Sequence, residues 1–159
     1  MKRHIIPVMM SLLTVAIVVS PAPVFGQSTI SGATGAGAGS FPGGTTFSGV
    51  SVSGLQFGMG VFTPGDTTAA GRVQMTLLGT TALGQPQNIE IGGDSANGTI
   101  NIDGSRTFSG TATVDMGDGT PPLTAVPFTV RASANTLLVT VGVNNLPVAS
   151  LTAGSIIID

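Results

Sequence analysis

Cysteine, tryptophan and tyrosine are absent from the 159 residues, and histidine and lysine occur only as His4 and Lys2. Beyond residue 4 the chain therefore offers no thiolate nucleophile, no cysteine or histidine zinc site, no Ser-His-Asp triad and no Schiff-base lysine. A pair of carboxylates, as in glycoside hydrolysis, is the enzyme chemistry that remains. We therefore expect a protein that is not an enzyme, and a carboxylate-only glycoside hydrolase is the weaker alternative.

Charged residues are scarce too, at 8% of the chain, and the formal net charge is −2. Of the five basic residues, Lys2 and Arg3 stand at the start, and Arg72, Arg106 and Arg131 are scattered along the rest. Phosphate backbones are bound by clustered cations, which this chain does not have. Nucleic acid is thus not an expected partner.

Residues 1–26 have the three parts of a secretory signal peptide. They comprise a basic head at 2–4, a mostly apolar run over 5–19 and small residues before a cleavage position at Gly26. The apolar run is short for a bilayer span of about 20 residues, so an uncleaved anchor is the weaker interpretation. We expect a secreted protein, in the extracellular space, at the cell surface or in the periplasm, with no membrane span in the mature chain.

Residues 27–44 are rich in glycine, alanine and serine and show no apolar period. This composition is typical of a flexible leader. The alternative is an extended arm that adds to the sheet edge of a neighbour by main-chain pairing. Residues 45–159 remain for a single domain, and their number is adequate for one hydrophobic core.

The clearest strand pattern covers residues 99–119, where polar and apolar residues alternate on both sides of an Asp-Gly turn. Ile100, Ile102 and Phe108 are all even-numbered, so they share one face only if the loop between the strands has an odd number of residues. We expect a three-residue loop with a bulge and a left-handed Gly104. The pattern predicts a hairpin in the core.

Other segments also alternate, and none beyond the signal has a helical period. Residues 92–98 are expected to form a loop, and the connection that contains it should have an even number of residues, because the inward positions change from odd at Ile91 to even at Ile100. Gly58 and Gly60 share one face of a strand and are expected to mark a bend or a close approach of backbone. The remaining strands are expected at 45–52, 55–61, 72–78, 87–91, 126–132, 136–143 and 155–159, and 146–151 is a short candidate that contains proline.

Eight or nine short strands with turns at regular spacing favour an all-β fold. We expect an antiparallel β-sandwich of immunoglobulin-like or jelly-roll-like form, and a partly closed β-barrel is the alternative. Of the seven phenylalanines, we expect the six beyond residue 26 to lie in the core. That core must stabilise the fold alone, because a chain without cysteine has no disulfides.

The most suggestive polar cluster is the stretch DMGDGT at residues 115–120. The carboxylates of Asp115 and Asp118 have a spacing that can present oxygens to a hard cation such as calcium. Aspartate and glycine also suit a tight turn, so a plain turn is the alternative. Calcium is the only cofactor that the sequence suggests, and no catalytic residue is predicted.

These observations together predict a secreted or cell-surface protein with a structural or adhesive role. Its weakly charged strands, rich in threonine, serine and glycine, favour self-association through sheet edges. The alternative function is a ligand-binding module for calcium or carbohydrate that uses the loops at residues 92–98 and 115–122.

Overall fold

A computed structural model describes residues 31–64 and 67–159, so the signal peptide expected at 1–26 lies outside the described residues. The described part is all-β and antiparallel, as the sequence predicted. No helix in these residues has the length and apolarity to cross a membrane. The strands are β1 (Ser31–Ser40), β2 (Thr46–Phe47), β3 (Val50–Thr63), β4 (Thr68–Thr80), β5 (Ile89–Ile100), β6 (Arg106–Asp115), β7 (Leu123–Ala132), β8 (Thr136–Val141), β9 (Asn144–Asn145) and β10 (Ala149–Ile158).

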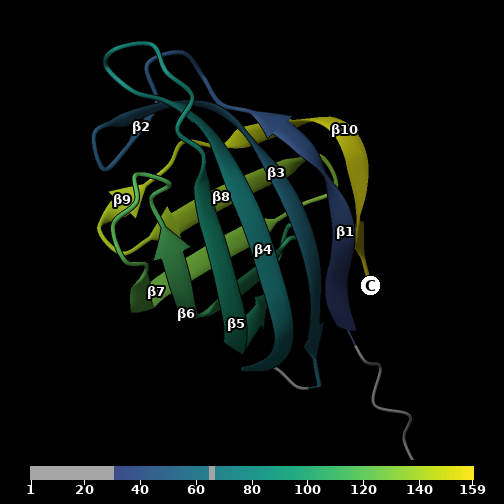
Figure 1. Cartoon of the computed structure of the whole chain (residues 1–159). Helices are drawn as coiled ribbons and strands as arrows, with labels where there is room; N and C mark the ends of the chain where they lie inside the picture. Colours follow the sequence, from purple (N-terminus) through teal and green to yellow (C-terminus); the bar gives the residue numbers. More distant parts are fainter. Residues whose placement is uncertain (1–30, 65–66) are drawn as a thin grey trace, which may run out of the picture.

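All ten strands belong to one sheet, in the order β1-β10-β8-β7-β6-β5-β4-β3-β2, with β9 on β8. In addition to β10, β1 pairs with β3. A reader who follows the hydrogen-bonded strands from β3 through β4 to β10 and β1 therefore arrives at β3 again. The shortest pairing on this path joins β8 and β10, at Leu137 with Ala149 and at Thr136 with Ser150. Figure 1 shows β3, β4 and β5 crossing in front of β7 and β8, which places the core between them.

The core is built from the inward residues of the alternating strands. Five of the six phenylalanines expected there are buried, but Phe62 is 51% exposed on the outer face of β3, so the prediction is wrong for that residue. The largest fully buried side chains include Phe47, Leu55, Leu77, Ile89, Phe108 and Leu137.

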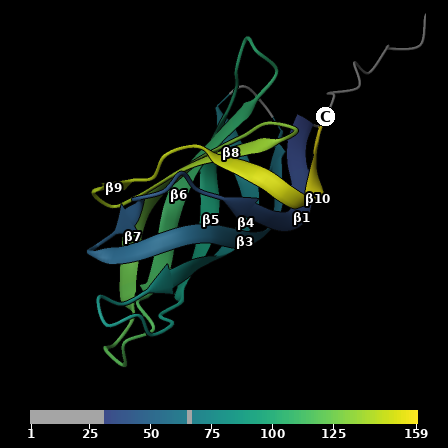
Figure 2. The same ribbon diagram turned by 90° about the horizontal axis from the view of Figure 1, so that it is seen from above.

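The flexible leader expected at residues 27–44 is wrong over Ser31–Ser40, which form β1 between β10 and β3 (Figure 2). A Cβ on Gly35 would lie 2.3 Å from the carbonyl oxygen of Ser155, and a Cβ on Gly37 would lie 2.2 Å from that of Ala153. Glycine is therefore required for the close approach of β10. The small residues that suggested flexibility meet a packing requirement, and the sheet begins before residue 45.

The loop expected at residues 92–98 is also wrong, because β5 runs without interruption from Ile89 to Ile100. The expected change of inward parity is real, but a β-bulge between Ser95 and Asn97 makes it, not a loop. One extra residue in a strand moves every later side chain to the opposite face. Two glycines of this segment make room for neighbouring side chains, since a Cβ on Gly93 would lie 2.6 Å from the ring of Phe128 and one on Gly98 would lie 2.4 Å from Cγ2 of Thr63.

The predicted hairpin at residues 99–119 is present as β5 and β6. Ile100 pairs with Arg106, so the loop is odd as expected but has five residues in place of three, and Gly104 is left-handed with φ of 81°. Ile100 and Ile102 are exposed, which contradicts their expected inward position. The reason is that this end of the hairpin extends past the core, where Arg106 occupies the inward position.

The single strand expected at residues 45–52 is wrong, because a two-residue turn divides it into β2 and the start of β3. Ser48 and Gly49 form this turn, and both have positive φ, at 47° and 87°. The strand expected at 126–132 is β7, which begins earlier, at Leu123, and lies between β6 and β8; its pairing with β8 stops one residue after Pro127, at Phe128. The short strands expected at 146–151 and 155–159 are joined in β10.

Candidate functional site

The outer face of the sheet is hollowed over β3, β4 and β5. Two adjoining depressions of about 360 and 260 Å³ share Gly58 and Gln74, and we call them together the β3–β5 groove. The outward residues that line the groove are Gln56, Gly58, Gly60, Arg72, Gln74, Thr76, Glu90 and Gly92.

Three glycines, Gly58, Gly60 and Gly92, make this hollow, and the backbone does not require them. None has a positive φ, a Cβ on Gly58 or Gly60 would meet no atom within 4 Å, and one on Gly92 would meet only Arg72 at 3.6 Å. Every other glycine within a described strand would bring a Cβ to 3.1 Å or less of a neighbouring atom. The expected close approach of backbone at Gly58 and Gly60 is therefore wrong, and a side chain at these positions would fill the groove.

The polar side chains of the groove stand in register across the strands. Gln56 pairs with Thr76, and Thr76 pairs with Glu90, while Gln74 stands between Gly58 and Gly92 in the next row. Directly opposite residues of antiparallel strands point to the same face, with Cβ atoms about 4.5 to 5.5 Å apart. An amide, a hydroxyl and a carboxylate thus lie side by side at one end of the groove.

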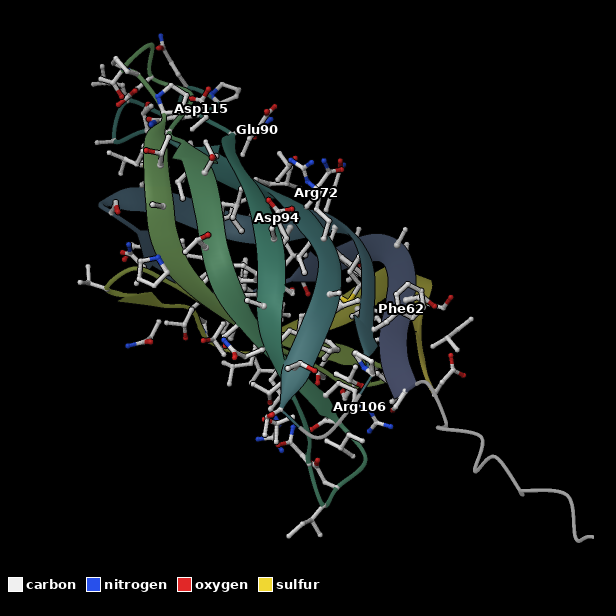
Figure 3. The ribbon with its side chains drawn as sticks, turned by 90° about the horizontal axis from the view of Figure 1, so that it is seen from below. Phe62, Arg72, Glu90, Asp94, Arg106 and Asp115 are labelled. Atoms are coloured by element: carbon white, nitrogen blue, oxygen red, sulfur yellow. The ribbon has the colours of Figure 1, made fainter. Side chains whose placement is uncertain are left out.

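An ion pair and an aromatic ring lie farther along the same face. Arg72 Nε is 4.0 Å from Asp94 Oδ1, and both side chains are well exposed, so the pair contributes little to folding. Phe62 follows Gly60 by two residues on β3 and therefore projects to the same side. Figure 3 shows Arg72, Asp94 and Phe62 projecting from the outer surface of neighbouring strands.

The two predicted calcium ligands, Asp115 and Asp118, each bond to their own turn. Asp115 Oδ1 accepts a hydrogen bond from the backbone N–H of Gly117 at 2.9 Å. Asp118 Oδ1 accepts one from the N–H of Thr120 at 2.9 Å and one from its hydroxyl at 2.6 Å. These bonds from Thr120 hold the pKa of Asp118 below its usual value, because they favour the ionised carboxylate.

The register also places Asp115 opposite Glu90, a neighbour that the sequence analysis did not assign to it. Figure 3 shows the two residues close together at one end of the outer face. In the described part of the chain no three acidic or histidine side chains gather as a metal site would require. Glu90 and Asp115 are the pair best placed to hold a cation, but together they supply only two carboxylates.

Two further acidic residues, Asp94 and Asp103, have partners away from this turn. Asp94 faces Arg72, and Asp103 accepts hydrogen bonds from Ser105 and Arg131 at the tip of the β5–β6 hairpin. The Ser105 hydroxyl and N–H, with a smaller contribution from Arg131, lower the pKa of Asp103. The structure therefore does not bring Asp94 and Asp103 to the 115–120 turn.

The sequence analysis missed the β3–β5 groove, although it identified the glycines that form it. It assigned ligand binding to the loops at 92–98 and 115–122, whereas the groove is made by strand residues. The signal that could have found it is the alternation of Gln56, Gly58, Gly60 and Phe62 on one face of β3. A scan against protein-family models and searches of curated proteins and solved structures find no match to this chain.

Proposed function

We propose that this protein is a secreted, non-catalytic adhesion module that binds an extended polysaccharide in its β3–β5 groove. The observation that carries the proposal is the set of three glycines without a steric cause. Glycine inside a strand costs roughly 0.5 to 1 kcal/mol relative to alanine. A fold that accepts a side chain at Gly58 and Gly60 yet lacks one supports a function that needs the open surface.

The chemistry of the lining suits a ligand rich in hydroxyl groups. Gln56 and Gln74 each offer a donor and an acceptor, Thr76 offers both in one group, and Glu90 accepts only. Sugar hydroxyls also donate and accept, so each can be matched along the groove. The half-exposed ring of Phe62 offers an apolar surface for the C–H face of a sugar ring.

The shape of the groove favours a polymer over a small molecule. It is shallow and follows β3, and the six steps from Gln56 to Phe62 cover roughly 20 Å at strand spacing. Among the described residues, Arg72 and Asp94 form the one ion pair beside the groove, and their opposite charges cancel. An uncharged polysaccharide that passes through the groove fits these properties best.

The arrangement of carboxylates supports binding without cleavage. Glycoside hydrolysis requires two carboxyl groups that flank the scissile bond, about 5 to 9.5 Å apart. Glu90 and Asp94 project from the same strand four residues apart, about 13 Å at strand spacing. Glu90 and Asp115 are adjacent on one outer surface, so they do not face each other across the groove.

Binding can be tested by affinity electrophoresis of the purified protein through gels that contain neutral polysaccharides. We expect at least one of these polysaccharides to retard the wild type. Gly60→Val should lose this retardation, whereas the matched control Ser51→Val on the same strand should keep it. Equal retardation of Gly60→Val and the wild type would overturn the proposal. Release of reducing ends from the retarding polysaccharide would replace binding by hydrolysis, and Glu90→Gln would then remove it.

A further inference from the structure

The last long strand, β10, pairs with β8 only through its first two residues, Ala149 and Ser150. Its pairing with β8 ends at Ser150, whereas its pairing with β1 continues to Ile158. A bulge at Thr152 separates the two parts, and the N–H of Leu151 bonds to the carbonyl of Asn135. Among the described residues, the side of β10 that faces away from β1 has no strand partner from residue 152 to 158.

The direction of the free backbone groups follows from the register. Gly32 and Asp159 exchange both N–H to carbonyl bonds, at 3.3 and 3.1 Å. Bonded and non-bonded pairs alternate along an antiparallel ladder. Gly154, Ile156 and Ile158 therefore direct their N–H and carbonyl groups away from β1, toward the free side.

We propose that two copies of this chain associate by antiparallel pairing of their β10 strands about a two-fold axis at Ile156. This register sets Ile156 opposite Ile156 of the second copy and Gly154 opposite Ile158. All three residues then use backbone groups that face the free side, and inward side chains stay inward. The contact is self-complementary, as a two-fold interface must be.

The composition of β10 favours this pairing. Sheet edges are commonly protected by charged residues, proline or bulges. Beyond the bulge at Thr152, residues 153–158 of β10 contain no charge and no proline, and the left-handed Gly154 does not interrupt their register with β1. The one-sided part of β7 differs, because it carries Pro127 and a left-handed Ala125.

The side chains beside the free edge also gain from association. Ile157 is 57% exposed on the outer face. In the proposed register it lies opposite Ser155 of the second copy, so the joined strands cover part of its apolar surface. The dimer does not depend on the proposed polysaccharide binding, but it would give one particle two grooves and raise its avidity.

Disulfide trapping tests the register directly, because the native chain has no cysteine. Residues 155 and 157 form a non-bonded pair across the two-fold axis, with Cα atoms about 4.5 Å apart, which suits a disulfide. We expect Ser155→Cys/Ile157→Cys to form a covalent dimer under mild oxidation at low protein concentration. The single variant Ser155→Cys is the control, because its two cysteines are diagonal and we expect little dimer.

Sedimentation velocity over a concentration series provides the second measurement. We expect a monomer–dimer equilibrium whose dissociation constant rises roughly tenfold or more in Ile157→Lys, because a charge at the edge opposes pairing. The control is Ile102→Lys, at a fully exposed position on the β5–β6 loop, and it should leave the equilibrium unchanged. A wild type that stays monomeric at every concentration, or a double cysteine variant that forms no dimer, would overturn the inference. Polysaccharide retardation of the monomeric variant would still report on the groove alone.

Discussion

Arg106 donates hydrogen bonds from Nε and Nη2 to the hydroxyl of Ser31, at 3.0 and 2.9 Å. The guanidinium also donates to the carbonyl oxygens of Gly104 and Asp159, at 2.9 and 2.5 Å. Arg106 is 8% exposed, and these hydrogen bonds go to a hydroxyl and to main-chain oxygens, not to an aspartate or glutamate side chain. One buried side chain thus joins the start of β1, the end of β10 and the β5–β6 loop.

Loss of these hydrogen bonds should be costly. In Arg106→Ala the Ser31 hydroxyl and the two carbonyls lose a buried charged donor, and we expect the free energy of unfolding to fall by about 3 kcal/mol. Urea denaturation measures this fall. The control is Arg131→Ala, because its ion pair with Asp103 is about half exposed and should contribute less than about 1 kcal/mol. Equal losses in the two variants would show that Arg106 is not a junction.

Replacing the groove glycines should stabilise the fold and weaken polysaccharide binding. We expect Gly58→Ala and Gly60→Ala to raise the free energy of unfolding by roughly 0.5 to 1 kcal/mol each, while polysaccharide retardation weakens. Thermal melting and affinity electrophoresis measure the two effects. The matched control Gly110→Ala should instead destabilise the protein, because its Cβ would lie 2.0 Å from the carbonyl oxygen of Asp94. A loss of stability in the groove variants would mean that the glycines serve the fold.

Phe62 should contribute to binding and little to folding. Its ring is half exposed, so we expect Phe62→Ala to leave the melting temperature nearly unchanged and to reduce polysaccharide affinity roughly tenfold. Phe128→Ala removes a buried ring and should cost about 3 to 5 kcal/mol. Unaltered retardation of Phe62→Ala would exclude the ring from the binding site.

The lowered pKa of Asp118 makes stability depend on acid pH. A carboxyl whose folded pKa lies below its unfolded value near 3.8 stabilises the fold above that value and loses the effect as pH falls through the folded pKa. We therefore expect melting temperatures of the wild type to fall below about pH 4, and Asp118→Asn to show a shallower fall. Melting curves between pH 5 and pH 2 test this, and parallel acid limbs would contradict it.

Calcium binding at Asp115 and Asp118 remains a prediction with a simple test. A bound ion would raise the melting temperature in millimolar calcium, since a ligand that binds only the folded state stabilises it. Asp115→Ala and Asp118→Ala would each remove that rise. Melting temperatures that do not respond to calcium in any of the three proteins would reject the site.

Strands whose polar and apolar side chains alternate could be predicted from the sequence, whereas a strand made of small residues could not. Phe108 and its neighbours on β6 carry a period of two that needs no tertiary information. Ser31–Ser40 carries none, because its glycines are set by the carbonyls of β10, a strand more than a hundred residues away. Such a constraint cannot be seen in a local window of sequence.

Parity arguments were correct about whether a connection has an odd or an even number of residues, and wrong about its length or about the structural feature that provides it. The change between Ile91 and Ile100 requires one extra residue, and both a loop and a bulge supply it. The groove was missed for a related reason. The position of Thr76 between Gln56 and Glu90 depends on the register of three strands, which only the folded sheet defines.

The pairing of β1 with β10 also governs the order in which the chain can fold. Gly32 can meet Asp159 only after all of the intervening strands have been synthesised, so this ladder joins residues more than a hundred positions apart in the chain. High contact order of this kind slows folding. During synthesis β1 therefore has no β10 to pair with until the sheet is nearly complete.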